Sequence, residues 1–206
     1  MRRKRSVWWL ALGLFVAVLA VSVEAQEPEK NSQPEQTRFS ADWVVGEIFI
    51  SKPVEIPLGA LQVIRDNLSL PPVAGCLERN GMTPEQVPAS WFAASEIHLA
   101  GPEEVDLIVQ PDLPKMVSHE IPPDTAKAAN CLLGANVGRF WVMRKNPSGR
   151  YSLLLATVAL GLEVLDSRAN FYRNIRTGAS TAVTSTTILY KMYVGQYQVA
   201  EKKTEP

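Results

Sequence analysis

The sequence has only two cysteines and two histidines among 206 residues, and this scarcity argues against most metal and cofactor sites. A zinc site needs three or four converging ligands, often in close pairs along the chain. Cys76, Cys131, His98 and His119 form no such pairs. A phosphate-binding loop places glycines directly before a helix, and the chain has no such pattern. We therefore expect no metal, nucleotide or other cofactor.

The shortage of histidine also leaves few ways to build a catalytic site. Only His98 and His119 could act as the base of a serine hydrolase. Residues 178–182 come nearest to the turn that holds the nucleophilic serine of such an enzyme, but they lack the second glycine of its G-x-S-x-G motif. His98 lies in an alternating stretch typical of a strand, and the prolines after His119 replace the helix of a zinc protease. Carboxylates that could form a glycosidase pair are Glu103, Glu104 and Asp106. Such groups are routine on strand and loop surfaces, so we predict no catalytic residue.

The chain lacks an excess of charge of either sign, with 21 basic and 21 acidic residues. Residues 1–25 contain four of the basic residues and one acidic residue, Glu24, so the rest has 17 basic and 20 acidic residues, a net charge near −3. A mildly acidic chain does not offer the positive surface that attracts nucleic-acid phosphates. We therefore expect no nucleic-acid partner.

Residues 1–25 are typical of a secretory signal peptide. A basic stretch at 2–5 precedes an uncharged apolar run at 7–23, and the small residues Val23 and Ala25 precede the expected cleavage site. We expect an exported protein, either periplasmic or secreted. An uncleaved anchor is the alternative, although the run of 17 residues is slightly shorter than the roughly 20 of a typical span. The membrane would then be contacted only through this segment.

The two cysteines, Cys76 and Cys131, are predicted to form a disulfide. An even pair in an oxidising compartment more often forms a bridge than stays free. The bridge would close a loop between residues 55 positions apart, which contributes about 4 kcal/mol to the free energy of unfolding in the chain-entropy estimate. A reactive thiol is the alternative, but the sequence has no C-x-x-C motif to support it.

The composition predicts one folded domain between two flexible ends. Residues 26–38 contain only polar residues and proline, which favours a disordered linker, and residues 201–206 are expected to form a flexible tail. Residues 39–200 are long enough for a single α+β domain and too short for two with linkers.

The apolar pattern within that domain changes from mixed to strand-like along the chain. Residues 58–68 have apolar side chains at helical spacing, at Leu58, Leu61, Ile64 and Leu68. Short apolar runs then recur between turn signals, of which Val194-Gly195 is one, at residues 139–144, 151–158, 162–165, 172–177, 183–192 and 197–199. The sequence therefore predicts an antiparallel β-sheet meander in the second half, with one or two packed helices from the first half.

Two parts of the domain resemble known proteins. Residues 99–109, LAGPEEVDLIV, resemble the hairpin of FG-GAP or VCBS-type repeats, in which an acidic glycine turn precedes Asp-Leu-Ile-Val. Pro102 and the two glutamates replace the calcium ligands of that family. The segments FWVMR at 140–144, YSLLL at 151–155 and YVGQY at 193–197, with Tyr190, resemble the carboxy-terminal sheets of uncharacterised exported bacterial proteins. That resemblance implies a periplasmic or secreted α+β module and no particular reaction.

Two groups of side chains could serve binding. The large aromatic residues are expected in the core, with a sugar or peptide platform as the alternative, and they are Trp91, Phe92, Phe140 and Trp141. The basic residues of the last hairpins could bind a carboxylate or an anionic glycan, or could form an ordinary solvated surface, and they are Arg168, Arg173, Arg176 and Lys191.

We predict an exported, non-catalytic binding or interaction module for an unknown protein or glycan partner. The first alternative is a cell-envelope or secreted hydrolase, which requires a cleft with convergent polar groups near His98 or His119. The second is an inhibitor-type protein that inserts the loop at residues 111–130 into its target. An exposed aromatic or apolar patch would favour the binding module.

Overall fold

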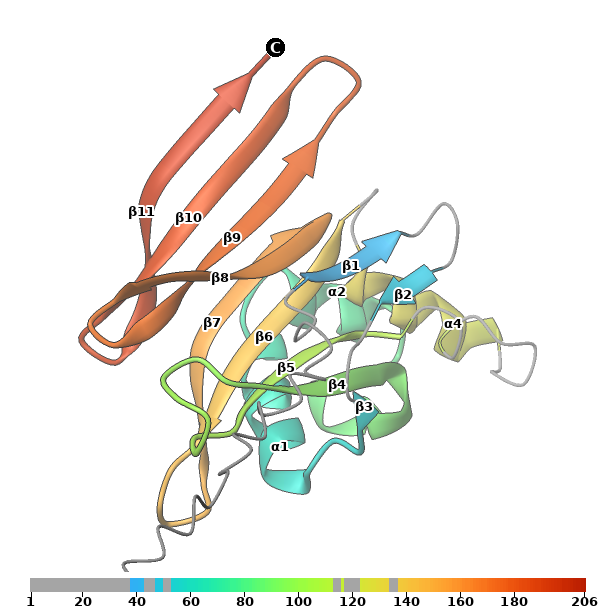
Figure 1. The fold of residues 1–206 in the computed structure, drawn as a ribbon. Helices are drawn as coiled ribbons and strands as arrows, with labels where there is room; N and C mark the ends of the chain where they lie inside the picture. Colours follow the sequence, from blue (N-terminus) through green and yellow to red (C-terminus); the bar gives the residue numbers. More distant parts are fainter. Residues whose placement is uncertain (1–37, 43–46, 50–52, 113–115, 117–122, 134–136) are drawn as a thin grey trace, which may run out of the picture. The chain divides into compact units, whose positions relative to one another are not determined.

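The computed structural model describes residues 38–206, apart from 43–46, 50–52, 113–115, 117–122 and 134–136. The expected signal peptide at 1–25 lies outside the described residues, as does the expected linker at 26–38 except for Arg38. The described residues form two antiparallel sheets, of six and five strands, together with short helices (Figure 1). The mixed α+β class expected from the sequence is therefore observed, with more strand than expected.

Sheet A contains the last four strands of the chain, which pair with one another in sequence order as an antiparallel meander. Strands β1 and β2 extend this sheet beyond β8, so its order is β11-β10-β9-β8-β1-β2. The bounds are β1 (Arg38–Asp42), β2 (Glu47–Phe49), β8 (Gly161–Ala169), β9 (Tyr172–Ser180), β10 (Ser185–Tyr193) and β11 (Gln196–Glu205).

Sheet B combines strands from both halves of the described chain in the order β3-β4-β5-β6-β7. The bounds are β3 (Pro53–Val54), β4 (Phe92–Ile97), β5 (Asp106–Pro111), β6 (Gly138–Lys145) and β7 (Tyr151–Ala159). Only Leu160 separates β7 from β8, and its backbone N–H bonds to the carbonyl of Gly178 at 2.7 Å. The chain passes here from sheet B to sheet A, so the second-half strands belong to two sheets instead of the single one expected.

The central strands of sheet B, β5 and β6, are largely buried on both faces because the sheet packs against a different core on each side. Phe140 and Val142 of β6 belong to the core between the two sheets, whereas Trp141 and Met143 belong to the core between sheet B and the helices. Strands buried on both faces read as continuous apolar runs. For this reason the sequence pattern of β6 could not indicate that a second sheet covers it.

Helix α1 (Leu58–Leu68) packs on sheet B, as predicted, and buries Ala60, Leu61, Ile64 and Leu68. The predicted stripe is wrong at Leu58, which opens the helix and is 84% exposed. The Oδ1 atom of Asn67 accepts a hydrogen bond at 2.8 Å from Nε1 of Trp141 on β6. This bond joins the end of the helix to the sheet.

The remaining helical segments are short. They are α2 (Val73–Arg79), α4 (Pro123–Ala129) and the 3-10 turns η1 (Pro84–Gln86), η2 (Ala89–Trp91) and η3 (Asn130–Leu132). Among the described residues, no helix is both long enough and apolar enough to cross a membrane.

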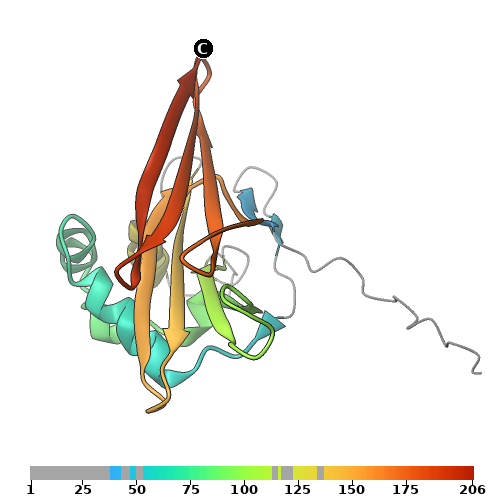
Figure 2. The ribbon, with the colours of Figure 1, turned by 60° about the vertical axis from the view of Figure 1, so that its left-hand side comes forward.

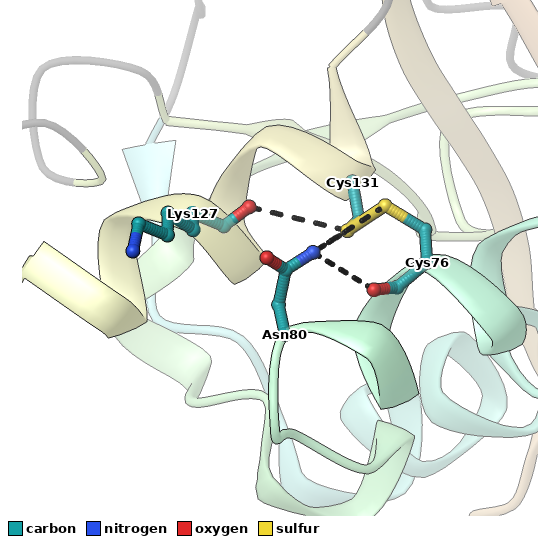
Figure 3. Close-up of a disulfide and its surroundings, with 4 residues drawn as sticks. All are labelled: Cys76, Asn80, Lys127 and Cys131. Carbon is teal, nitrogen blue, oxygen red and sulfur yellow. Dashed lines mark hydrogen bonds between the residues drawn. A yellow bond between two sulfur atoms is a disulfide. The ribbon is translucent and has the colours of Figure 1, made fainter.

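The predicted disulfide joins α2 to η3 (Figure 3). The sulfur atoms of Cys76 and Cys131 are 2.06 Å apart, and their Cα atoms are 5.7 Å apart. The side-chain N–H of Asn80 bonds to the Cys76 carbonyl at 2.9 Å and lies 3.6 Å from the Cys131 sulfur. The bridge therefore connects the first-half helices to the segment that precedes β6.

The expected flexible tail at residues 201–206 is corrected by the structure, which extends β11 to Glu205. The backbone of this segment pairs with β10, for example Thr204 with Thr186 and Lys202 with Ile188. All side chains at 201–206 are exposed. Their polar composition is therefore that of a solvated strand end and does not require disorder.

Candidate binding surface

Two hairpin turns lie at the same end of sheet A (Figures 1 and 2). The first, between β8 and β9, contains Asn170 and Phe171, and the second, between β10 and β11, contains Val194 and Gly195. The φ angles of these four residues are 49°, 72°, 46° and 80° respectively. Positive φ at both central residues is the pattern of a type I′ turn, which suits the twist of a two-residue hairpin.

Large apolar side chains project from these turns into solvent. Phe171 is 86% exposed, Val194 is 85% exposed and Tyr193 is 59% exposed. We call the two turns, together with these three exposed side chains, the turn pair. The turn that ends β10 was expected from the Val194 and Gly195 dipeptide, whereas the exposure of Phe171 and Tyr193 was not foreseen. Asn170, shortly before the strand pattern at 172–177, could have indicated the first turn.

The backbone conformation at Phe171 and Val194 is unfavourable for these two residues. Left-handed φ places the Cβ atom close to the following carbonyl, which costs roughly 1–2 kcal/mol for a residue other than glycine. A type I′ turn is most easily made by Asn-Gly. The first turn departs from that pair at Phe171 and the second at Val194. Because both side chains are exposed, packing in the core does not offset this cost.

Hydrogen bonds hold the first turn against its neighbours. The Nη1 atom of Arg168 donates to the carbonyls of Phe171 at 2.8 Å and Ala100 at 2.7 Å. The Asn170 side chain donates to the carbonyl of Met192 at 2.8 Å, and this bond joins the β8–β9 turn to β10. The two turns are therefore fixed relative to each other.

A bulge in β8 lies next to the first turn and is held by two buried side chains. The pairing of β8 with β9 shifts between Val164 and Arg168. Arg173 donates to the carbonyls of Leu165 at 3.0 Å and Val164 at 3.1 Å, and Asn174 donates to the hydroxyl of Ser167 at 2.9 Å. These bonds fix the backbone conformation at the end of β8.

A charged cluster beneath the turns connects the two sheets. The carboxylate of Asp106 on β5 accepts bonds from Nε of Arg144 at 2.7 Å and from Nη2 at 3.0 Å. Arg144 also pairs with Glu104 at 2.9 Å, bonds to the hydroxyl of Tyr172 and lies over its ring. Burial lowers the pKa of Arg144, but the hydrogen bonds and charge of Asp106 outweigh this effect, so the pKa is raised overall.

Of the three carboxylates considered for a glycosidase, Glu104 and Asp106 are thus engaged by Arg144, and Glu103 is exposed. Asp106 is 1% exposed and also accepts the backbone N–H of Leu99 at 3.1 Å. A carboxylate held by a bidentate guanidinium and a backbone donor has a structural role here, because it fixes the β4–β5 loop to β6. The structure brings Glu104 and Asp106 together around a cation and not around an open cleft.

Of the two histidines, His98 is described and His119 lies outside the described residues. The Nδ1 atom of His98 is 3.1 Å from the backbone carbonyl of Glu104. Within the described part of the chain, no three His, Cys, Asp or Glu side chains gather as metal ligands would. An inhibitor was expected to insert the loop at 111–130 into its target. Most residues of this loop that precede α4 likewise lie outside the described residues.

The expected core position of the large aromatics is confirmed. Trp91, Phe92, Phe140 and Trp141 are all at most 4% exposed. The rings of Phe92 and Trp141 pack edge to face, with centroids 5.6 Å apart and an interplanar angle of 87°. None of these four residues is available as a surface platform.

The basic residues of the last hairpins do not form one open basic face. Arg168 and Arg173 hold backbone carbonyls, and Arg173 also pairs with Asp166 at 3.2 Å. Arg176 pairs with Glu163, with Nε 3.0 Å from the carboxylate. Lys191 is exposed. Three of the four charges therefore stabilise sheet A locally.

A shallow groove of about 520 Å³ crosses β8, β9 and β10 near the opposite end of these strands. Gly161 and Gly178 are paired in register, and the absence of two side chains opens the groove. Its charged lining residues, Glu163 and Arg176, neutralise each other, and hydroxyls such as Ser180 and Thr187 complete the lining. This surface mixes hydroxyl-bearing and apolar residues and has no net charge, in contrast to the exposed apolar side chains of the turn pair.

Comparisons of the chain with protein-family models, curated protein sequences and solved structures found no match.

Proposed function

We propose that the protein is an exported, non-catalytic interaction module that binds a partner protein through the turn pair. The observation that carries this proposal is the exposure of Phe171 and Val194 in left-handed turns that glycine and asparagine would form at lower cost. Strained residues that persist without a packing gain are found preferentially at functional sites.

The chemistry of the turn pair suits a protein partner. Tyrosine and phenylalanine are enriched in protein–protein interfaces and supply large contact areas with few rotatable bonds. The hydrogen bonds of Arg168 and Asn170 order the turns before binding, which reduces the entropy lost on association. A glycan partner is favoured less, because the hydroxyl groups that could bind a sugar line the groove on β8–β10, away from the turn pair.

The proposed export is supported by two features. The amino-terminal segment has the sequence of a signal peptide, and the Cys76–Cys131 disulfide suits an oxidising compartment. We infer a periplasmic or secreted location and kinship with uncharacterised exported bacterial α+β proteins. A hydrolase has no comparable support, because the described partner of His98 is a backbone carbonyl, which can orient an imidazole but supplies no nucleophile.

Site-specific photo-crosslinking tests the proposal. A benzophenone side chain would replace Tyr193 in one variant and Lys203 on the far part of β11 in a control variant, each in the full chain expressed in its own cells. We expect a discrete crosslinked protein from position 193, absent from position 203 and lost when F171G is added. Identical products from both positions, or no product at 193, would contradict the proposal.

A further inference from the structure

A pocket of about 180 Å³ lies where the connection between α1 and α2 meets strands β6 and β7. The connection contributes Leu70, Pro71 and Pro72, and the strands contribute Arg139, Trp141 and Val158. These residues belong to the side of sheet B that faces the helices, which is separate from the turn pair on sheet A.

Of the described residues that line this pocket, Arg139 is the only charged one. It is half-buried, and among the described residues no acidic side chain pairs with it. Loss of hydration on burial lowers its pKa. By contrast, Arg144 and Arg176 each have a carboxylate partner. A partly desolvated charge without a counter-ion is unfavourable, so the pocket is suited to an anion.

Most of the other residues that line the pocket are apolar. Leu70 and Val158 are large apolar residues with 57% and 45% exposure, and both border the pocket. Val158 is paired in register with Arg139 across β6 and β7. The Trp141 ring is held by its bond to Asn67. A ligand with an apolar group could therefore cover exposed apolar surface while its charge meets the guanidinium.

The charge and size of the pocket narrow the ligand class. A single guanidinium matches one carboxylate in bidentate geometry, whereas a phosphate monoester carries about −1.5 to −2 charges near pH 7 and would stay partly unneutralised. The volume is below the roughly 300–1,000 Å³ of sites for drug-sized ligands. We propose that this pocket binds a small carboxylate with an apolar group, its carboxylate on Arg139 and its apolar part against Leu70, Trp141 and Val158.

Calorimetric titration of residues 26–206 with hexanoate and with neutral hexanamide tests this proposal. We expect saturable hexanoate binding and at least about tenfold weaker binding of hexanamide, because only the acid can form the charge-assisted pair. R139M should bind hexanoate about as weakly as wild type binds hexanamide. The matched control R150M, in the exposed β6–β7 turn, should bind like wild type. Absence of hexanoate binding to wild type, or unchanged binding to R139M, would overturn the proposal.

A second pair of variants keeps the test valid if R139M does not fold. V158E places a carboxylate on the strand opposite Arg139, so it should raise the unfolding midpoint and remove hexanoate binding. V158Q removes the same apolar contact without adding a charge, so it should bind hexanoate more weakly than wild type but measurably more tightly than V158E. Equal hexanoate affinity of V158E and V158Q would refute the assignment. A peptide ending in leucine with a free carboxylate, compared with its amide, identifies the source: tighter binding than hexanoate indicates a polypeptide terminus, and equal binding indicates a free acid.

Discussion

Replacement of Phe171 by glycine should stabilise the protein, although it removes a large side chain. The φ of Phe171 is 72° and its side chain is 86% exposed, so glycine relieves the backbone cost with little loss of packing. The relief is about 1–2 kcal/mol, and the greater flexibility of glycine in the unfolded chain returns about 0.5–1 kcal/mol. We therefore expect a net gain of about 0.5–1 kcal/mol, which corresponds to a midpoint increase of roughly 1–4 °C for a domain of this size.

Urea denaturation with the disulfide intact would measure this gain, and F171A is its matched control. Alanine removes the ring but keeps the Cβ atom that makes the left-handed conformation unfavourable. We expect F171A to be no more stable than wild type. Equal stabilisation by F171A and F171G would show that the gain comes from removing exposed apolar surface. A destabilised F171G would show that the ring packs against the protein, and either result would refute the reasoning.

Three further predictions concern the rest of the fold. The C76S/C131S double variant should lose up to about 4 kcal/mol of stability in urea, because it releases a 55-residue loop constraint in the unfolded chain, and a loss below about 1 kcal/mol would contradict a strong constraint. D106N should lose about 3 kcal/mol in the same assay because Arg144 then loses its buried counter-ion, whereas D66N at the exposed Asp66 should be neutral. Burial raises the pKa of Tyr197, so the folded state retains this proton above pH ~10, where the unfolded state loses it. Stability should therefore fall as pH rises above ~10, and less steeply in Y197F, as measured by urea midpoints at several pH values; an unchanged slope in Y197F would contradict this assignment.

Several elements could be predicted because their signals are local. The apolar spacing of residues 58–68 indicated α1, the short apolar runs separated by turns indicated the meander, and the two cysteines could pair only with each other. The division of the strands between two sheets depends on a long-range choice. Strand β6 pairs with β5, from which a segment of more than 25 residues separates it, and no local pattern specifies that pairing.

The candidate binding surfaces were less accessible to sequence reasoning. Val194 and Gly195 indicated a turn, but the positive φ of Phe171 depends on its hairpin and has no signature in the apolar pattern. The Arg139 pocket combines a helix connection with two strands that are distant in sequence. The sequence suggested a basic surface at Arg168, Arg173 and Arg176. Their partners are backbone carbonyls and nearby carboxylates, which only the folded structure reveals.

The central claim is that the turn pair binds a partner protein, and the most direct test compares partner affinity with stability. The F171G/V194N double variant converts both turns to Asn-Gly, and V183N changes an exposed valine at the opposite end of sheet A. Affinity for the crosslinked partner would be measured for both variants and wild type. We predict that the double variant is more stable and loses at least about tenfold in affinity, whereas V183N binds normally. Wild-type affinity in the double variant, or an equal loss in V183N, would contradict the proposed function.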